Sequence, residues 1–164
     1  MATQVQFRRG TTAQHGSFTG AVGEVTVDTD KDTVVVHDGS QAGGFAIPNL
    51  KTAQEFTKTQ NFNATTLSDA STIAWDASSN QVAKVTLGGN RILGAATNQV
   101  DGAVYVLTVI QDGSGSRTLS FNSNYKFTGG SAPTLSTAAS ATDVLVFLSN
   151  GTNMLEIGRS LNVS

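Results

Sequence analysis

The 164-residue sequence contains no cysteine, which excludes disulfide bridges and thiolate metal sites. Only 13% of its residues are charged, against the ~25% usual for globular proteins. No apolar run approaches the ~18 residues that a membrane-spanning helix needs. Proline is rare at 2 residues and glycine frequent at 17, a composition that favours turns and strands over helices.

Charge is evenly distributed, and the net charge is −2. Residues 1–60 carry five Lys or Arg and six Asp or Glu, and residues 61–164 carry the same numbers. Because no basic surface can neutralise phosphates, neither nucleic acid nor an anionic membrane is expected as a partner. The first four residues lack the charged and apolar regions of a signal peptide, so we expect synthesis in the cytoplasm.

The first segment predicts a short strand followed by a short helix. Val5 and Phe7 alternate with glutamines, and Gly10 is expected to end the strand. Thr11-Thr12-Ala13-Gln14 is a Thr-x-x-Gln capping box, which predicts a helical turn that starts at Thr11.

Residues 24–37 predict a β-hairpin with a polar turn at residues 29–32. Val25 and Val27 lie on one face of its first strand. Three consecutive valines make the second strand apolar on both faces, so we expect it to be central or covered by a partner chain. Replacing Val36 with Asp should then disrupt it by burying an unpaired charge.

Three patterns suggest ion binding but lack the residues that it requires. Residues 28–32 begin like a calcium loop, without the glycine and the bidentate glutamate that follow in such loops. Residues 112–116 have the glycines of a phosphate loop but not its Gly-Lys-Ser/Thr ending. His15 and His37 are the only histidines, too few for a persuasive metal site alone. We interpret the two segments as turns and both histidines as structural.

Residues 48–61 are predicted to connect two domains, residues 1–47 and 62–164. Leu50, Ala53 and Phe56 lie three residues apart, which is compatible with a short amphipathic helix. A plain linker is equally compatible with the sequence.

Residues 62–164 are a series of apolar segments separated by turn signals, which predicts an antiparallel β-sandwich or small barrel. Residues 103–111 and 143–148 are apolar on both faces, and both are predicted to be strands covered on both sides. Asn150-Gly151 predicts a hairpin that returns through residues 154–157. A sandwich buries one face of each strand, so a neighbouring subunit is expected to cover the other face.

No motif for covalent catalysis is present, and no cofactor is expected. The aromatic residues of the second domain fit core positions. Trp75 is the one that could instead contact a glycan, since tryptophan is often only partly buried. A glycosidase needs two carboxylates that flank a sugar, which the sequence does not identify.

Three segments together carry a resemblance to a known family: residues 6–14 (Gln-Phe-Arg-Arg-Gly-Thr-Thr-Ala-Gln), residues 23–28 (Gly-Glu-Val-Thr-Val-Asp) and residues 36–39 (Val-His-Asp-Gly). They resemble, in the same order, the small N-terminal module of phage tail-fibre and receptor-binding proteins, including the major tropism determinant family. The resemblance covers roughly residues 1–47. From about Phe62 the chain is more loosely similar to β-rich domains of phage fibre and virion proteins.

The resemblance implies an all-β protein with an N-terminal β-hairpin module for virion attachment or trimerisation and a jelly-roll-like C-terminal domain. It implies a homotrimeric, non-enzymatic fibre or spike component of a tailed-phage virion that takes part in attachment. A capsid decoration protein is the alternative, and a polysaccharide depolymerase a remote one. The expected partners are further copies of the chain, other tail or capsid proteins and a host surface glycan or protein. The expected virion or subunit contacts are Arg8, Arg9, Thr11 and Gln14, and the expected outward loop or glycan contacts are Trp75, Asp112 and Ser114.

Overall fold

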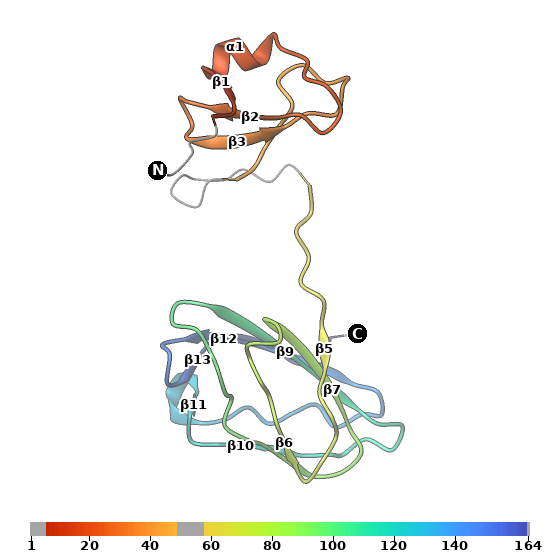
Figure 1. The fold of residues 1–164 in the computed structure, drawn as a ribbon. Helices are drawn as coiled ribbons and strands as arrows, with labels where there is room; N and C mark the ends of the chain where they lie inside the picture. The colour runs from red at the N-terminus through yellow and green to blue at the C-terminus, as the bar shows by residue number, and fades with distance from the viewer. Residues whose placement is uncertain (1–5, 49–57, 164) are drawn as a thin grey trace. The chain divides into compact units, whose positions relative to one another are not determined.

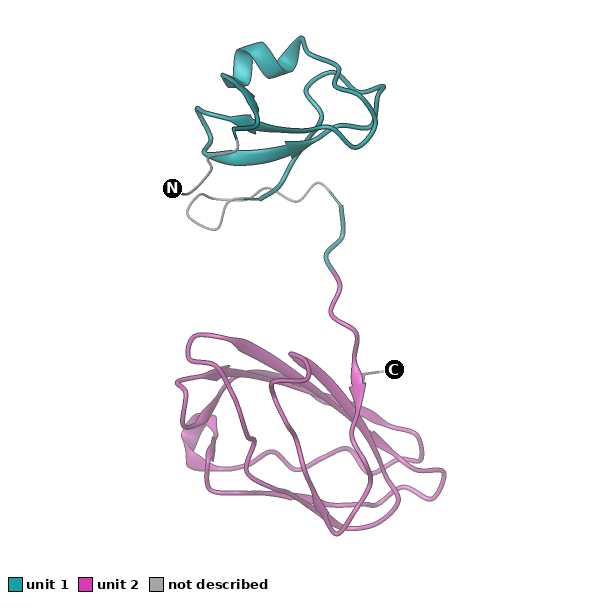
Figure 2. Ribbon diagram, viewed as in Figure 1, with its two compact units in different colours: residues 1–60 teal, residues 61–164 magenta. Residues whose placement is uncertain are grey.

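The computed structural model describes residues 6–48 and 58–163, and the chain divides into two compact units, residues 1–60 and residues 61–164 (Figures 1 and 2). The regular secondary structure of both units is mainly strand, and helix in the described residues amounts to two short segments. The predicted all-β class is therefore confirmed. None of the described helices is long and apolar enough to span a membrane.

Unit 1 is a four-stranded sheet with strand order β1-β2-β3-β4 and one short helix. Strand β1 runs parallel to β2, whereas β2, β3 and β4 pair antiparallel. The predicted hairpin of residues 24–37 is confirmed as β2 and β3. The elements are β1 (Arg8–Gly10), α1 (Thr12–Gly16), β2 (Val25–Asp28), β3 (Thr33–Val36) and β4 (Phe45–Ala46).

The first strand lies later in the chain than predicted. The strand was expected around Val5 and Phe7, but β1 begins at Arg8; it ends at Gly10, as expected, and Gly10 itself pairs with Asp28. The Gly10 carbonyl also accepts a hydrogen bond from the Thr29 N–H at 2.9 Å. Parallel pairing with β2 therefore outweighs the low strand preference of glycine. Val5 lies outside the described residues.

Strand β3 is central, as predicted, but only one of its faces is buried. Val35 is 2% exposed, whereas Val34 and Val36 are 37% and 38% exposed. Val36 is therefore not buried within the described chain, and an Asp there would bury its charge only if a partner covered this face.

Unit 2 contains a six-stranded sheet of order β11-β13-β12-β9-β7-β5 and a three-stranded sheet of order β10-β8-β6. Its strands are β5 (Thr65–Thr66), β6 (Thr72–Ile73), β7 (Val82–Leu87), β8 (Arg91–Leu93), β9 (Val104–Gln111), β10 (Leu119–Phe121), β11 (Tyr125–Lys126), β12 (Thr142–Ser149) and β13 (Met154–Ser160). A 3-10 turn, η1 (Thr128–Gly130), follows β11.

The predicted antiparallel arrangement of unit 2 is largely wrong. From β5 to β11, successive strands alternate between the two sheets (Figure 1). Neighbours within a sheet are therefore two strands apart in sequence, and β5, β7 and β9 pair in parallel, as do β6, β8 and β10. Antiparallel pairs occur between β9 and β12 and in the β12–β13 hairpin at Asn150-Gly151, which confirms that one predicted hairpin. This winding differs from the antiparallel jelly roll.

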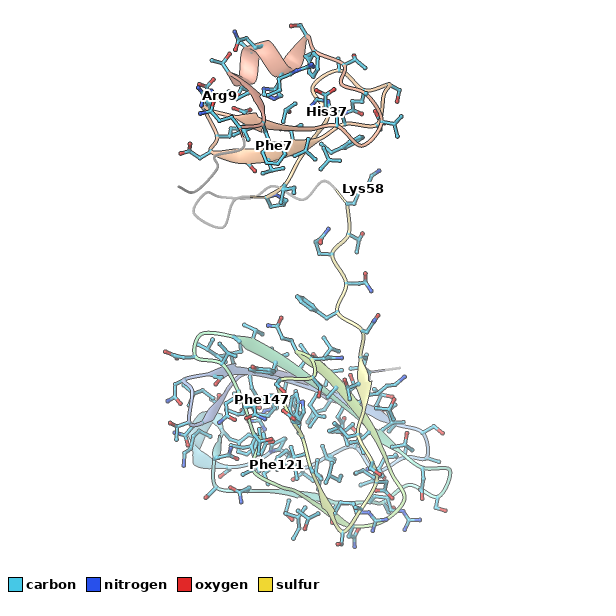
Figure 3. All side chains as sticks on the ribbon, viewed as in Figure 1. Phe7, Arg9, His37, Lys58, Phe121 and Phe147 are labelled. Atoms are coloured by element: carbon cyan, nitrogen blue, oxygen red, sulfur yellow. The ribbon has the colours of Figure 1, made fainter. Side chains whose placement is uncertain are left out.

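The core of unit 2 lies between its two sheets. The three-stranded sheet contributes Ile73, Leu93 and Leu119, and the six-stranded sheet contributes alternate residues of β7, β9 and β12. Phe147 lies in this interior with Phe121 packed at its margin (Figure 3). The predicted inward residues of β7, Val85 and Leu87, are confirmed as fully buried.

Strands β9 and β12 were predicted to be covered on both faces, and the structure covers one. In β9, Leu107 and Val109 are fully buried, while Val106 and Ile110 on the opposite face are partly exposed. Strand β12 shows the same alternation. The described chain supplies no second layer for this opposite face. The predicted connector helix falls mainly on residues 49–57, outside the described residues.

Candidate functional site: the N-terminal module

The signature segment of unit 1 forms the predicted capping box. The Thr11 hydroxyl oxygen accepts a hydrogen bond from the Gln14 backbone N–H at 3.2 Å, and the Gln14 side-chain oxygen accepts one from the Thr11 N–H at 2.8 Å. Thr11 caps helix α1, which ends after five residues at Gly16. The side chains of Thr11 and Gln14, which were expected as virion or subunit contacts, are therefore already hydrogen-bonded to backbone groups at the start of the helix.

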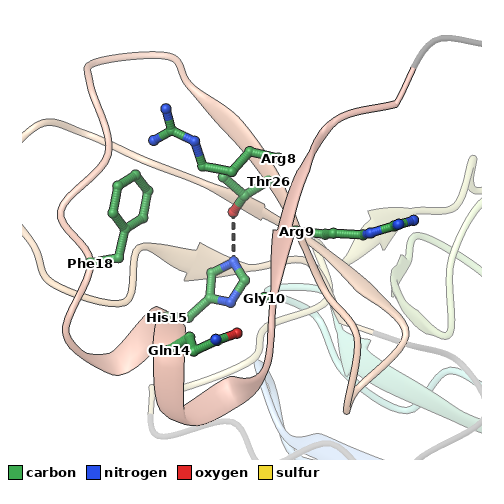
Figure 4. A pocket seen from close by; sticks show the side chains of 7 residues that line it. All are labelled: Arg8, Arg9, Gly10, Gln14, His15, Phe18 and Thr26. Carbon is green, nitrogen blue, oxygen red and sulfur yellow. Dashed lines mark hydrogen bonds between the residues drawn. The ribbon is translucent and has the colours of Figure 1, made fainter.

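Arg8 and Arg9 point to opposite sides of β1 (Figure 4). Arg8 forms an ion pair of 2.9 Å with Glu24, and its guanidinium carbon lies 4.9 Å from the centre of the Phe18 ring. Arg9 is exposed on the other side, beside Val27 of the neighbouring strand. Arg9 is therefore the better placed of the two for an intermolecular contact.

A pocket of about 240 Å³ lies beside β1 and α1 (Figure 4). Arg8, Gln14, His15, Phe18 and Thr26 are among the residues that line it. The pocket thus combines a cation, an aromatic ring and hydrogen-bonding groups. Its inner wall is the polar interior of unit 1.

That interior is built around two histidines joined by a threonine. Thr26 Oγ1 lies 2.8 Å from His15 Nε2 and 2.9 Å from His37 Nε2. His15 is 6% exposed, Thr26 1% and His37 2%. The two imidazole rings are stacked, with centroids 6.2 Å apart. The sequence indicated structural histidines, but nothing in their spacing showed that they share one partner.

The turn of residues 29–32 is exposed, as its polar sequence predicted, but Asp28 at the end of β2 is buried. Asp28 is 3% exposed, and its carboxylate accepts hydrogen bonds from the Thr12 hydroxyl and from the N–H groups of Asp30 and Lys31. Burial alone would raise the pKa of Asp28, but these hydrogen bonds outweigh it and lower the pKa. The carboxylate therefore fastens the β2–β3 turn to α1.

The other side of the sheet is apolar and partly exposed. Register places Val25 beside Val36, and Val27 beside Val34, on the side opposite Thr26 and His37. Phe45 pairs with Val36 on the same side, and the Ile47 N–H donates to the Val34 carbonyl. We call this surface the outer face; it consists of Val25, Val27, Val34, Val36, Phe45 and Ile47.

The predicted contacts of unit 2 fall in different environments. Trp75 is 1% exposed and packs edge-on against Tyr105, so its ring offers no surface on which a sugar could stack. Ser114 is exposed. The Asp112 carboxylate accepts hydrogen bonds from the Ser114 and Gly115 N–H groups and from Arg117. The hydrogen bond from Arg117 contributes most to holding the pKa of Asp112 below its usual value.

The ion pair between Arg91 and Asp69 was not anticipated from the sequence. Arg91 donates to both oxygens of Asp69 at 2.8 and 2.7 Å, which lowers the pKa of that carboxyl. Asp69 lies 22 positions before Arg91, and no local pattern links two residues at that separation. Among the described residues, no group of three or more histidine, aspartate or glutamate side chains could hold a metal ion.

Two family descriptions match the chain. Residues 5–41 match "Major tropism determinant N-terminal domain", and residues 52–154, more than half of the chain, match "Putative phage tail fibre C-terminal domain". A tail fiber receptor-binding protein of Bordetella phage BPP-1 is 55% identical over 75 residues. That alignment covers 39% of this chain and 20% of the relative.

Solved structures of major tropism determinant variants are also similar. The M1 variant is 25% identical with a TM-score of 0.31, and the I1 variant 30% identical with a TM-score of 0.30. The alignments cover 93% and 88% of this chain but 42% and 38% of those chains. This chain thus spans less than half the length of the relatives it matches. TM-scores this low do not establish a shared overall fold, so the family assignment rests on the sequence match.

Proposed function

This chain belongs to the phage tail fibre C-terminal domain family, and from that premise we propose that it is a non-enzymatic, homotrimeric component of a tailed-phage fibre. Unit 1 joins the copies and fixes them to other virion proteins. Unit 2 is carried outward and takes part in attachment to the host. The observation that carries the self-association is the exposed apolar outer face of unit 1.

The outer face is unusual for a small soluble module. Phe45 and Ile47 are 51% and 50% exposed, and Val34 and Val36 are each more than a third exposed. Contiguous apolar patches on a sheet mark interaction surfaces, because water leaves them favourably when a partner covers them. Arg9 lies at the margin of this face, where a polar rim is expected around an apolar interface.

A second copy of the chain is the simplest partner for such a face. The half-covered face of β9 and β12 in unit 2, with Val106, Ile110, Val144 and Val146, adds a further apolar surface. The number three comes from the resemblance to trimeric fibre proteins. Repetition of weak sites on each trimer, and of trimers on a particle, would raise the avidity for a host surface without one strong site.

The mass of the full chain in solution tests this proposal. Multi-angle light scattering at micromolar concentration should give three times the mass of one chain. A chain that remains monomeric under these conditions would contradict the proposed self-association.

The variant Val36→Asp locates the interface. It should lower the mass toward one chain while leaving unit 1 folded, because the side chain points away from the buried side of the sheet. Val22→Asp is the matched control, since Val22 lies outside the outer face and is 82% exposed. If both variants assemble alike, the outer face is not the interface.

The position of the protein on the particle is a separate question. Labelled antibody imaged on intact virions by electron microscopy should bind to the fibres or the tail tip. Label spread over the head would support the capsid decoration protein instead, which the family matches do not favour. Cleavage of a host polysaccharide by the purified chain would overturn the non-enzymatic assignment.

A further inference from the structure

The two histidines of the protein belong to one series of hydrogen bonds that runs through the interior of unit 1. The Thr11 carbonyl can only accept, so His15 Nδ1, at 3.0 Å from it, carries a proton. The Gly20 N–H can only donate, so His37 Nδ1, at 3.3 Å, carries none. These two ends fix the protonation of both rings.

The hydrogen bonds of Thr26 with the two histidines then have only one consistent assignment of donors and acceptors. His37 has its proton on Nε2 and donates to Thr26 Oγ1, and the Thr26 hydroxyl donates in turn to His15 Nε2. Every donor has an acceptor when both imidazoles are neutral, and each is held in a different tautomer. The backbone at Gly20 and Gly44 packs closely against His37, since a Cβ added at either glycine would lie 2.6 or 2.7 Å from its ring.

A proton on either ring breaks this arrangement. A protonated His37 would direct an Nδ1–H at the Gly20 N–H, so that two donors would meet. A protonated His15 would direct an Nε2–H at Thr26 Oγ1, and the Thr26 hydroxyl proton would lose its acceptor. Two cationic rings stacked 6.2 Å apart would also repel each other in a buried site.

The charged groups around the rings do not compensate for an added proton. From β1, the Arg8 guanidinium covers Phe18, whose ring contacts His37 edge-on, and adds positive charge on that side. From β2, Glu24 pairs with Arg8, and Asp28 accepts hydrogen bonds from α1 and its own turn. Asp38, which follows His37, accepts from the N–H groups of its own loop. No carboxylate of the described residues hydrogen-bonds either imidazole.

We propose that the His15–Thr26–His37 chain is an acid-sensitive switch, which keeps unit 1 folded while both imidazoles are neutral and releases it when they take up protons. The unfolded chain binds protons that the folded unit cannot accommodate, so stability falls as the pH falls. The unfolding equilibrium of unit 1 should therefore shift toward the unfolded state between pH 7.5 and pH 5. The switch lies on the buried side of the sheet and does not rest on the proposed self-association.

Nitrogen-15 NMR of the full-length chain tests the neutral pair directly. At pH 7.5 His15 should show the Nδ1–H tautomer and His37 the Nε2–H tautomer, and the sequence contains no third histidine whose signals could overlap with theirs. Between pH 7.5 and 5, backbone signals of unit 1 should shift toward the unfolded state. Unit 2 has no histidine, and Trp75 fluorescence should report it unchanged.

Two sets of variants test the cause. His15→Gln/His37→Gln retains polar groups that cannot titrate in this range, and it should abolish the acid response of unit 1. Thr26→Ser retains the bridging hydroxyl and should respond like the unmodified chain, whereas Thr26→Val should destabilise unit 1 already at pH 7.5. An acid response that survives the double substitution, or a Thr26→Val chain as stable as the unmodified one, would overturn the proposal. If the double variant does not fold, a cationic or mixed-tautomer ring at pH 7.5 in the unmodified chain would overturn it by itself.

Discussion

The two units of this chain differ in the kind of side chain that they bury. In unit 1, Val35 is the single buried apolar side chain among the described residues, and the other buried side chains are His15, Thr26, Asp28, Thr33 and His37. Unit 2 buries a continuous apolar cluster between its two sheets, with Trp75, Tyr105 and Phe147 as its largest members.

The difference shows where each unit obtains its stability. A module of this size cannot bury much apolar surface by itself, so its fold depends strongly on directional hydrogen bonds. Unit 2 is large enough to enclose a core with its own two sheets. Core substitutions should therefore dominate in unit 2, and polar or surface substitutions in unit 1.

The largest effect is expected in the core of unit 2. Phe147→Ala should lower the free energy of unfolding by about 3–5 kcal/mol, because Phe147 is fully buried between Tyr125 and Phe127. Urea unfolding followed by Trp75 fluorescence measures it. Phe62→Ala is the control, since Phe62 is 61% exposed and should change little. An equal effect of both variants would contradict the assigned core.

The next effect concerns the close packing of loops in unit 2. Gly115 has φ of +70°, and a Cβ there would lie 2.4 Å from the Thr137 carbonyl oxygen. Gly115→Ala should lower the free energy of unfolding by about 2–4 kcal/mol through backbone strain and this clash. Gly129 also has φ of +70° but no atom within 4 Å of such a Cβ, so Gly129→Ala isolates the strain alone. The same fluorescence assay should rank Gly115→Ala clearly below Gly129→Ala in stability.

In unit 1 a single carboxylate should matter. Asp28→Asn should lower the free energy of unfolding by about 1–3 kcal/mol at pH 7, since it weakens charge-assisted hydrogen bonds to Thr12 and the turn. The lowered pKa of Asp28 means that its contribution is present above the unfolded value near 3.9 and is lost as the pH falls below it. Circular dichroism and NMR of unit 1 signals between pH 6 and 2.5 would measure this loss. The Asn variant should lack that part of the acid dependence, and an unchanged profile would assign it to other groups.

The smallest effect is expected for the surface ion pair of unit 2. Arg91→Ala should cost no more than about 1 kcal/mol, because both partners are roughly one quarter exposed and salt screens them. The urea midpoint of the variant should lie below that of the unmodified chain at low salt, and the difference should shrink at high salt. If Arg91→Ala lowered the free energy of unfolding as much as Asp28→Asn, surface polar contacts in unit 2 would matter as much as buried ones in unit 1, which would contradict the comparison.

Local patterns in the sequence predicted several elements correctly. The Thr11–Gln14 capping box, the β2–β3 hairpin, the inward residues of β7 and the Asn150-Gly151 hairpin are each specified by residues within one short segment. Local hydrogen bonds and side-chain periodicity are sufficient for such features. The all-β class followed from the same periodicity and from the composition.

Other features depend on which segments meet in space. Successive strands of unit 2 cross between two sheets, and no local signal distinguishes that winding from a series of hairpins, so the antiparallel prediction failed. The apolar runs in β9 and β12 looked doubly covered, because periodicity cannot show whether a second layer exists. Trp75 was a candidate contact by its residue type alone, and its packing against Tyr105 places it in the core.

The sequence by itself therefore determined the β class, the short-range turns and caps, and the family, because each is written in contiguous residues. Only the tertiary structure decided that His15 and His37 share Thr26, that Asp69 meets Arg91, and that one side of the unit 1 sheet is polar and buried while the other is apolar and partly exposed. These depend on residues 11 to 22 positions apart and on the register between strands, which is set by the packing of the whole unit rather than by any one segment.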